Sequence, residues 1–120
     1  MRVLIVDDSS VMRKIVARGL RQAGFKIDDI LEAGDGVEAL QMVTAHNFDL
    51  ILSDWNMPNM DGLTFVKELR KSDDTPVVMV TTEGGEGKVA EAIQNGANGH
   101  IKKPFTPEDL KATLGQFFRG

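Results

Sequence analysis

Polar side chains that could bind a metal ion or a phosphate follow short apolar runs at four places in the sequence. Asp7 and Asp8 come after the first run, Asp54 after the third, Thr81 after the fourth and Lys103 after the fifth. A single acid in such a place is often only a helix cap or a turn former. Three carboxylates, a hydroxyl and an ammonium group indicate a binding site if the fold brings them together.

The apolar runs have the length and composition of strands that are buried in a sheet. They cover residues 3–6, 27–33, 50–52, 77–80 and 99–102, and the more polar second run is expected at an edge. Helical patterns lie between the runs and after the last one. This alternation predicts an α/β fold with a doubly wound, five-stranded parallel sheet and right-handed crossovers.

Apolar residues at helical spacing mark the expected helices and their buried faces. These faces include Ile15 in the first helix, Val37 in the second and Ile93 in the fourth. Thr106 followed by Pro107 predicts the start of the fifth helix, because threonine caps well and proline fits the first helical position.

Three glycines stand where the fourth helix should begin, at Gly84, Gly85 and Gly87. Each glycine inside a helix costs about 1 kcal/mol relative to alanine. The start of this helix is therefore expected to be frayed or late, and we expect a mobile element there.

Length and composition limit the class of protein. The chain has 120 residues, of which 42% are hydrophobic, so we expect one domain spanning residues 1–120 with no attached output domain. The net charge of −4 argues against a nucleic-acid partner, and the absence of cysteine excludes thiol catalysis. The apolar run at the N-terminus is too short for a signal peptide or a membrane span, which favours a cytoplasmic protein.

The carboxyl ends of parallel strands share one edge of a sheet, so Asp7, Asp8, Asp54, Thr81 and Lys103 should converge. Two carboxylates about 4 Å apart repel by about 4 kcal/mol at an effective dielectric constant near 20. A cation or a bound proton must relieve this repulsion, and an open site of oxygen ligands suits Mg²⁺. A metal, a carboxylate nucleophile, a hydroxyl and an ammonium group are the parts needed to receive a phosphoryl group.

These residues resemble the signature of the receiver domains of two-component response regulators, and the likeness covers essentially the whole chain. The segment from Asp54 to Gly62 is most similar to single-domain chemotaxis members of that family. The resemblance implies a flavodoxin-like (βα)5 fold with strand order 2-1-3-4-5. It also implies a phosphorylation-activated signalling switch, not an enzyme, in which Asp54 accepts a phosphoryl group from a histidine kinase.

The resemblance further implies the roles of the site residues. Mg²⁺ would be bound by the three acids and by the main-chain carbonyl of Asn56, while Thr81 and Lys103 would bind the phosphoryl oxygens. Asn56 and Glu83 match positions that tune dephosphorylation in the family. The peptide bond between Lys103 and Pro104 would be cis.

The expected partners are a chemotaxis-type histidine kinase, a flagellar motor switch protein or another protein target, and a phosphatase. A monomer without nucleic-acid or membrane partners is expected. A phosphorelay intermediate or a non-flagellar target would fit the same signature.

His100 departs from the family pattern, in which a tyrosine or phenylalanine usually occupies the switch position. An imidazole has less apolar area and can change its charge near neutral pH. We therefore expect weaker, pH-sensitive coupling between Asp54 and the output surface.

Rival functions fit the sequence less well. An aspartate-nucleophile phosphohydrolase needs a second acid two residues after the nucleophile, where this chain has Asn56. An FMN module needs a hydroxyl-rich and glycine-rich loop in place of Asp7 and Asp8. A nucleotide-binding loop at residues 82–89 fails at Thr82 and Val89, and a calcium loop fails at Pro58.

Overall fold

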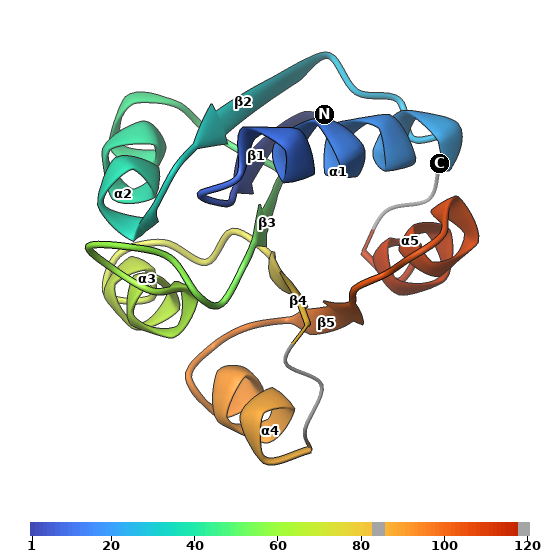
Figure 1. Cartoon of the computed structure of the whole chain (residues 1–120). Helices are drawn as coiled ribbons and strands as arrows, with labels where there is room; N and C mark the ends of the chain where they lie inside the picture. Colours follow the sequence, from blue (N-terminus) through green and yellow to red (C-terminus); the bar gives the residue numbers. More distant parts are fainter. Residues whose placement is uncertain (83–85, 118–120) are drawn as a thin grey trace.

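The computed structural model describes residues 1–82 and 86–117, within which strands and helices alternate along the chain (Figure 1). The strands are β1 (Arg2–Val6), β2 (Asp29–Ala33), β3 (Leu50–Ser53), β4 (Val77–Thr81) and β5 (Gly99–Lys102). The helices are α1 (Ser10–Gln22), α2 (Gly36–Ala45), α3 (Gly62–Leu69), α4 (Glu86–Gln94) and α5 (Pro107–Leu114). None of the helices in the described ranges is long and apolar enough to cross a membrane.

The strands form one parallel sheet in the order β2-β1-β3-β4-β5. Helices α1 and α5 cover one face, and α2, α3 and α4 cover the other (Figure 1). The predicted α/β class, the five parallel strands and their order are therefore confirmed.

The central strands are buried on both faces because alternate side chains enter different cores. On β1, Leu4 and Val6 pack with residues of α2 and α3, whereas Val3 and Ile5 pack with residues of α1 and α5. All four are at most 1% exposed. The parallel pairing of Val6 with Ser53 makes the carboxyl ends of β1 and β3 neighbours.

The second strand begins at Asp29, two residues later than predicted. The pairing of β2 with β1 starts with Arg2 and Asp29, so residues 27 and 28 are not paired with any residue of β1. Ile27 is still partly buried against the core on the α1 side, which explains its apolar character. The predicted edge position of this strand is confirmed.

Side-chain caps fix where several helices begin. Ser9 Oγ accepts a hydrogen bond from the N–H of Met12 at 3.2 Å at the start of α1. Thr106 and Asp109 form a reciprocal capping box at α5, with Pro107 in the predicted place. Such caps satisfy N–H groups that have no partner within the helix.

Three apolar residues that were predicted on buried helix faces are exposed instead. Ile15 is 48%, Val37 40% and Ile93 45% exposed. The residues that are buried include Val16 in α1 and Ala92 in α4, because each helix presents only a narrow row of side chains to the sheet.

Helix α4 begins at Glu86, with Gly87 inside it. Gly84 and Gly85 lie outside the described residues, so the expected mobility of this region stays a prediction.

Candidate functional site

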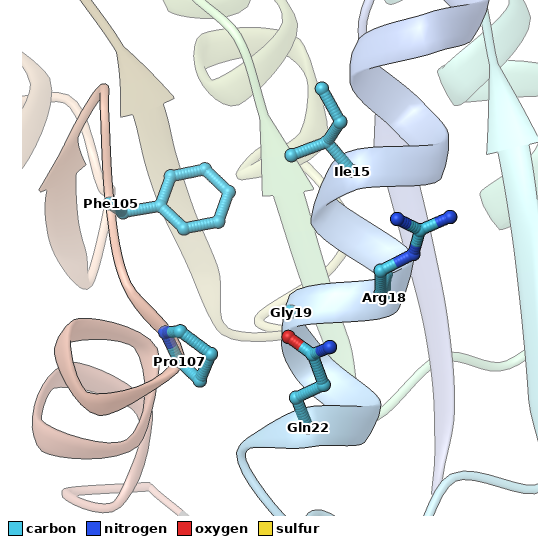
Figure 2. Close-up of a pocket in the computed structure, with 6 residues that line it drawn as sticks. All are labelled: Ile15, Arg18, Gly19, Gln22, Phe105 and Pro107. Carbon is cyan, nitrogen blue, oxygen red and sulfur yellow. The ribbon is translucent and has the colours of Figure 1, made fainter.

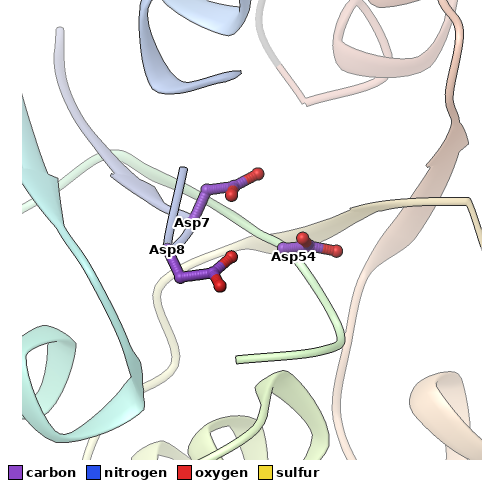
Figure 3. A group of neighbouring side chains, drawn as sticks. All are labelled: Asp7, Asp8 and Asp54. Carbon is purple, nitrogen blue, oxygen red and sulfur yellow. The ribbon is translucent and has the colours of Figure 1, made fainter. Parts of the chain in front are cut away.

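Three acids meet at the carboxyl edge of the sheet, as the strand ends predicted. One carboxylate oxygen from each of Asp7, Asp8 and Asp54 lies within 4.8 Å of the others (Figure 3). The N–H of Asp54 donates to the carbonyl of Val6 at 2.8 Å, which continues the pairing of β3 with β1 up to the acids. Asp7 is buried, Asp54 is partly buried and Asp8 is exposed, so the cluster is open to solvent on one side.

Lys103 reaches into this acidic cluster from the chain that follows β5. Its Nζ lies 3.1 Å from Asp7 Oδ2 and 3.3 Å from Asp54 Oδ2, and its side chain is only 11% exposed. The N–H of Lys103 also donates to the carbonyl of Thr81 at 2.9 Å. The peptide bond between Lys103 and Pro104 is cis, which confirms that prediction.

Thr81 and His100 lie on neighbouring strands near the same edge. Thr81 ends β4 and is 1% exposed. His100 pairs with Met79, two positions before Thr81, so the pleat places the three side chains on one face of the sheet. The Nε2 atom of His100 is buried and has no hydrogen-bond partner among the described residues.

The segment after Asp54 holds its carboxylate in place. The N–H of Trp55 donates to Asp54 Oδ1 at 2.7 Å, and the Trp55 carbonyl accepts from the N–H of Gly62 at 2.8 Å. Trp55 is 7% exposed, with Lys88 Nζ 5.2 Å from the centre of its ring. Asn56, next to it, is exposed, whereas Glu83 lies outside the described residues.

The surroundings of Asp54 raise the pKa of its carboxyl group above the ordinary value. Burial raises the pKa of Asp54, and the nearby Asp7 carboxylate raises it further. The Lys103 ammonium and the Trp55 N–H act in the opposite direction but do not cancel the effect of burial. The charged form of Asp54 is therefore less favourable than it would be in water, and a bound cation would favour it.

The raised pKa leads to a stability prediction for Asp54→Asn without divalent cations. A raised carboxyl pKa means that the folded state prefers the protonated form, so the charge present at pH 7 opposes folding. The amide should therefore increase the free energy of unfolding at pH 7. The increase should vanish as the pH falls toward 3.8, because the folded protein then protonates Asp54. Urea unfolding at both pH values measures this, and an unchanged or lower stability at pH 7 would contradict it.

The acidic cluster has the ligand chemistry of a magnesium site. Its donors are carboxylate oxygens, which Mg²⁺ prefers, and the exposed position of Asp8 leaves room for water ligands. One ammonium group, that of Lys103, is shared by Asp7 and Asp54 and cannot balance three acids. The residues present therefore fit a divalent cation.

Arg13 supports the site and was not predicted from the sequence. Its Nη1 donates to the carbonyl of Asp7 at 2.6 Å, and its Nε pairs with Glu32 at 2.7 Å. A basic residue one turn after the capping Ser9 was the available signal. Its contact with β2, however, depends on tertiary packing.

A side-chain hydrogen bond connects the segment after Asp54 to the residue that caps α2. Asn59, at a φ of 64°, donates from Nδ2 to Asp35 Oδ2 at 2.7 Å. This bond lowers the pKa of Asp35, which also caps α2 by accepting from the N–H of Glu38. Asparagine tolerates positive φ better than most residues. Its presence in the segment after Asp54 was the signal in the sequence that could have indicated a turn at this position.

The chain is similar to known proteins over almost all of its length. Residues 3–115 match the family model of the response regulator receiver domain. The chemotaxis protein CheY homolog of Campylobacter jejuni is 48% identical over 118 residues, which cover 95% of this chain and 89% of that protein. Chemotaxis protein CheY1 of Helicobacter pylori is 44% identical, with 95% and 94% covered.

Solved structures of chemotaxis proteins are also similar to this chain, both in fold and in sequence. Vibrio cholerae CheY4 aligns with a TM-score of 0.82 at 42% identity and covers 98% of both chains. CheY in the CheX–CheY–BeF3–Mg²⁺ complex of Borrelia burgdorferi aligns with a TM-score of 0.87 at 31% identity, covering 97% of this chain and 87% of that one. With its parallel sheet, its acids at the strand ends and these relatives, the chain belongs to the response regulator receiver family.

Proposed function

We propose that this chain is a phosphorylation-activated switch of a two-component system that controls chemotaxis, with Asp54 as the phosphoryl acceptor. The observation that carries the proposal is the partly exposed Asp54 carboxylate, which lies beside Asp7 and shares the Lys103 ammonium with it. The names of the relatives support chemotaxis as the process. Members of the family act as switches, and residues 1–120 would work as a single receiver domain in the cytoplasm.

The phosphoryl transfer follows from the chemistry of the site. A carboxylate oxygen of Asp54 forms a bond to phosphorus while the bond from phosphorus to the kinase histidine breaks. The imidazole nitrogen keeps the electron pair and takes up a proton. Lys103 would neutralise charge on the transferred oxygens, and the Thr81 hydroxyl would donate a hydrogen bond to one of them.

Mg²⁺ would be held by Asp7, Asp8, Asp54 and the carbonyl of Asn56, and it would neutralise charge on the acids and on the phosphoryl oxygens. Asn56 and Glu83 would tune hydrolysis of the phosphorylated aspartate.

The phosphoryl group brings three acceptor oxygens and about −1.5 to −2 charges in place of the single charge of the Asp54 carboxylate. Thr81 would turn toward these oxygens, and His100, on the same face of the sheet, would move into the space it leaves. Repacking of this kind changes the surface of α4, β5 and α5, and a partner would select the changed surface.

Protein partners follow from this account. We propose a histidine kinase as the phosphoryl donor, a flagellar motor switch protein as the target and a phosphatase that resets the switch. A CheY of Borrelia burgdorferi is known in complex with CheX, which supports a protein partner for this chain as well.

His100→Tyr is expected to strengthen the coupling between Asp54 and the surface of α4, β5 and α5. A phenol ring has more apolar area than an imidazole, so its burial should stabilise the switched state further. The emission change of Trp55 on phosphorylation should therefore be larger in His100→Tyr than in the wild type. His46→Gln is the matched control and should keep the wild-type response. An equal or smaller emission change of His100→Tyr would contradict this role.

The emission of Trp55, the only tryptophan, tests the proposed function. Mg²⁺ is added first and a small acyl phosphate second, and each should change the emission of the wild type because the ring adjoins Asp54. Asp74→Asn, an exposed acid outside the cluster, should behave like the wild type. Absence of an Mg²⁺-dependent change in the wild type would count against the proposal.

A further inference from the structure

Arg13, near the start of α1, reaches back to the acidic cluster and uses two different nitrogen atoms for its contacts. Its Nη1 donates to the main-chain carbonyl of Asp7 at 2.6 Å, and its Nε donates to Glu32 Oε1 at 2.7 Å. The guanidinium therefore connects the turn after β1 with the edge strand β2. Its side chain is only 19% exposed, and the two contacts hold the planar group in one orientation.

The carbonyl that Arg13 contacts belongs to the peptide unit that joins two acids of the cluster, Asp7 and Asp8. A peptide unit is planar, so the direction of its carbonyl also sets the direction in which the chain enters Asp8. Asp7 is held at other atoms as well. Its N–H donates to the carbonyl of Ala33 at 3.0 Å, and its Oδ1 accepts from the N–H of Ser9 at 2.9 Å. The contact from Arg13 adds a restraint on the peptide itself, and through the peptide on Asp8.

Close packing fixes helix α1, and with it the position from which Arg13 reaches the acids. A Cβ atom at Gly19 would lie 2.7 Å from Leu110 and 3.3 Å from the ring of Phe105, so glycine permits α1 and α5 to approach closely. Gly19 and Phe105 lie on opposite walls of a pocket of about 130 Å³ between the two helices (Figure 2). Val16 is buried in the core on the same side of the sheet. The backbone of α1 is therefore a firm support for the guanidinium.

We propose that Arg13 is a positioning residue for the metal site. By holding the peptide between Asp7 and Asp8, and by being oriented itself by Glu32, it gives the two carboxylates the placement that a divalent cation requires. The inference rests on the proposed magnesium site and adds to it a residue that orients the ligands without binding the ion. Hydrogen bonds that orient metal ligands commonly contribute about 10- to 100-fold to metal affinity.

The charge of Arg13 would have the opposite effect on the affinity for the cation. A guanidinium beside the acids repels a divalent cation, so the loss of its charge alone should strengthen Mg²⁺ binding. The loss of its hydrogen bond to Asp7 should weaken Mg²⁺ binding, because the peptide between the two acids then becomes free to turn. The direction of the change in affinity therefore separates a positioning role from a purely electrostatic one.

A matched ion pair at the opposite end of the same two strands provides the control. Arg2 Nη2 lies 3.2 Å from Asp29 Oδ2, and the two residues are partners where β1 and β2 begin. Arg2 precedes Asp7 by five positions, which corresponds to about 16 Å along a strand. This distance exceeds the screening length at physiological salt, which is about 8 Å. Arg2→Met therefore removes a guanidinium from the same pair of strands without affecting the acids.

Titration of the full chain with Mg²⁺, followed by the emission of Trp55, tests the proposal. Arg13→Met should bind Mg²⁺ at least about tenfold more weakly than the wild type. Arg13→Lys keeps the charge but has no rigid fork to contact both partners, so its affinity should lie between the two. Arg2→Met should bind like the wild type. Without Mg²⁺, the amide of residue 8 should exchange its hydrogen faster in Arg13→Met than in the wild type or in Arg2→Met.

Binding of Mg²⁺ by either Arg13 variant as tight as that of the wild type would overturn the proposal. Equal weakening by Arg2→Met would overturn it too, because the effect would then not be specific to the cluster. Urea unfolding without Mg²⁺ measures the stability of each variant. A loss of stability in Arg13→Met with unchanged Mg²⁺ affinity would leave Arg13 only a structural role. A wild type that does not respond to Mg²⁺ would instead refute the proposed magnesium site itself.

Discussion

Asp54→Asn is expected to lose at least about 100-fold of the phosphoryl uptake from a small acyl phosphate. The amide has no charge and is a far weaker nucleophile than the carboxylate that Lys103 contacts at 3.3 Å. The fold should remain intact, because asparagine keeps the shape of the side chain and removes a charge that burial disfavours. The readout is the second, donor-dependent step in the emission of Trp55.

The variant Asp8→Asn tests the contribution of a metal ligand separately from that of the phosphoryl acceptor. Asp8 is the exposed member of the cluster, so this variant should need more Mg²⁺ but still respond to the donor when Mg²⁺ is in excess. A donor-dependent response of Asp54→Asn equal to that of the wild type would show that another residue accepts the phosphoryl group.

Gly62→Ala is expected to have the largest effect on stability among single substitutions near the site. Gly62 begins α3, and a Cβ atom there would collide with the main-chain carbonyl of Asp54 and lie 2.8 Å from Met79 Cε. Backbone cannot move aside as a flexible side chain can, so the segment carrying Asp54 must shift. We expect a loss of about 2–4 kcal/mol in the free energy of unfolding, together with weaker Mg²⁺ binding.

Gly87→Ala is the matched control for this prediction. Gly87 lies inside α4, and a Cβ atom would have nothing within 4 Å. Alanine is the better helix former, so this variant should be about as stable as the wild type or up to about 1 kcal/mol more stable. Urea unfolding of both variants measures the difference. A Gly62→Ala protein as stable as Gly87→Ala would refute the close contact between α3 and Asp54.

The sequence was most informative where local pattern and topology reinforce each other. Buried strands that alternate with helices fixed the sheet as parallel, and a parallel sheet brings all of its carboxyl ends to one edge. Asp7 and Asp54 are 47 positions apart in the sequence. Their convergence nevertheless followed from this argument, because each comes directly after the last residue of a strand. The fold and the composition of the site could therefore be predicted together.

The sequence was less informative about contacts that depend on packing between elements. Ile15 and Ile93 fit the helical pattern of buried residues, but the helices turn those positions to solvent. The pair of Arg13 with Glu32 requires the relative placement of α1 and β2, which no local spacing encodes. The same holds for the sharing of Lys103 between Asp7 and Asp54.

Chemical trapping of the phosphorylated residue tests the central claim most directly. Borohydride reduces an acyl phosphate to an alcohol, which converts an aspartyl phosphate into homoserine that peptide mass spectrometry can locate. After treatment with Mg²⁺ and an acyl phosphate, we predict homoserine at position 54 and none when Mg²⁺ is removed by a chelator. Homoserine at Asp7 or Asp8, or none at any position although the donor is consumed, would contradict the assignment of Asp54 as the phosphoryl acceptor.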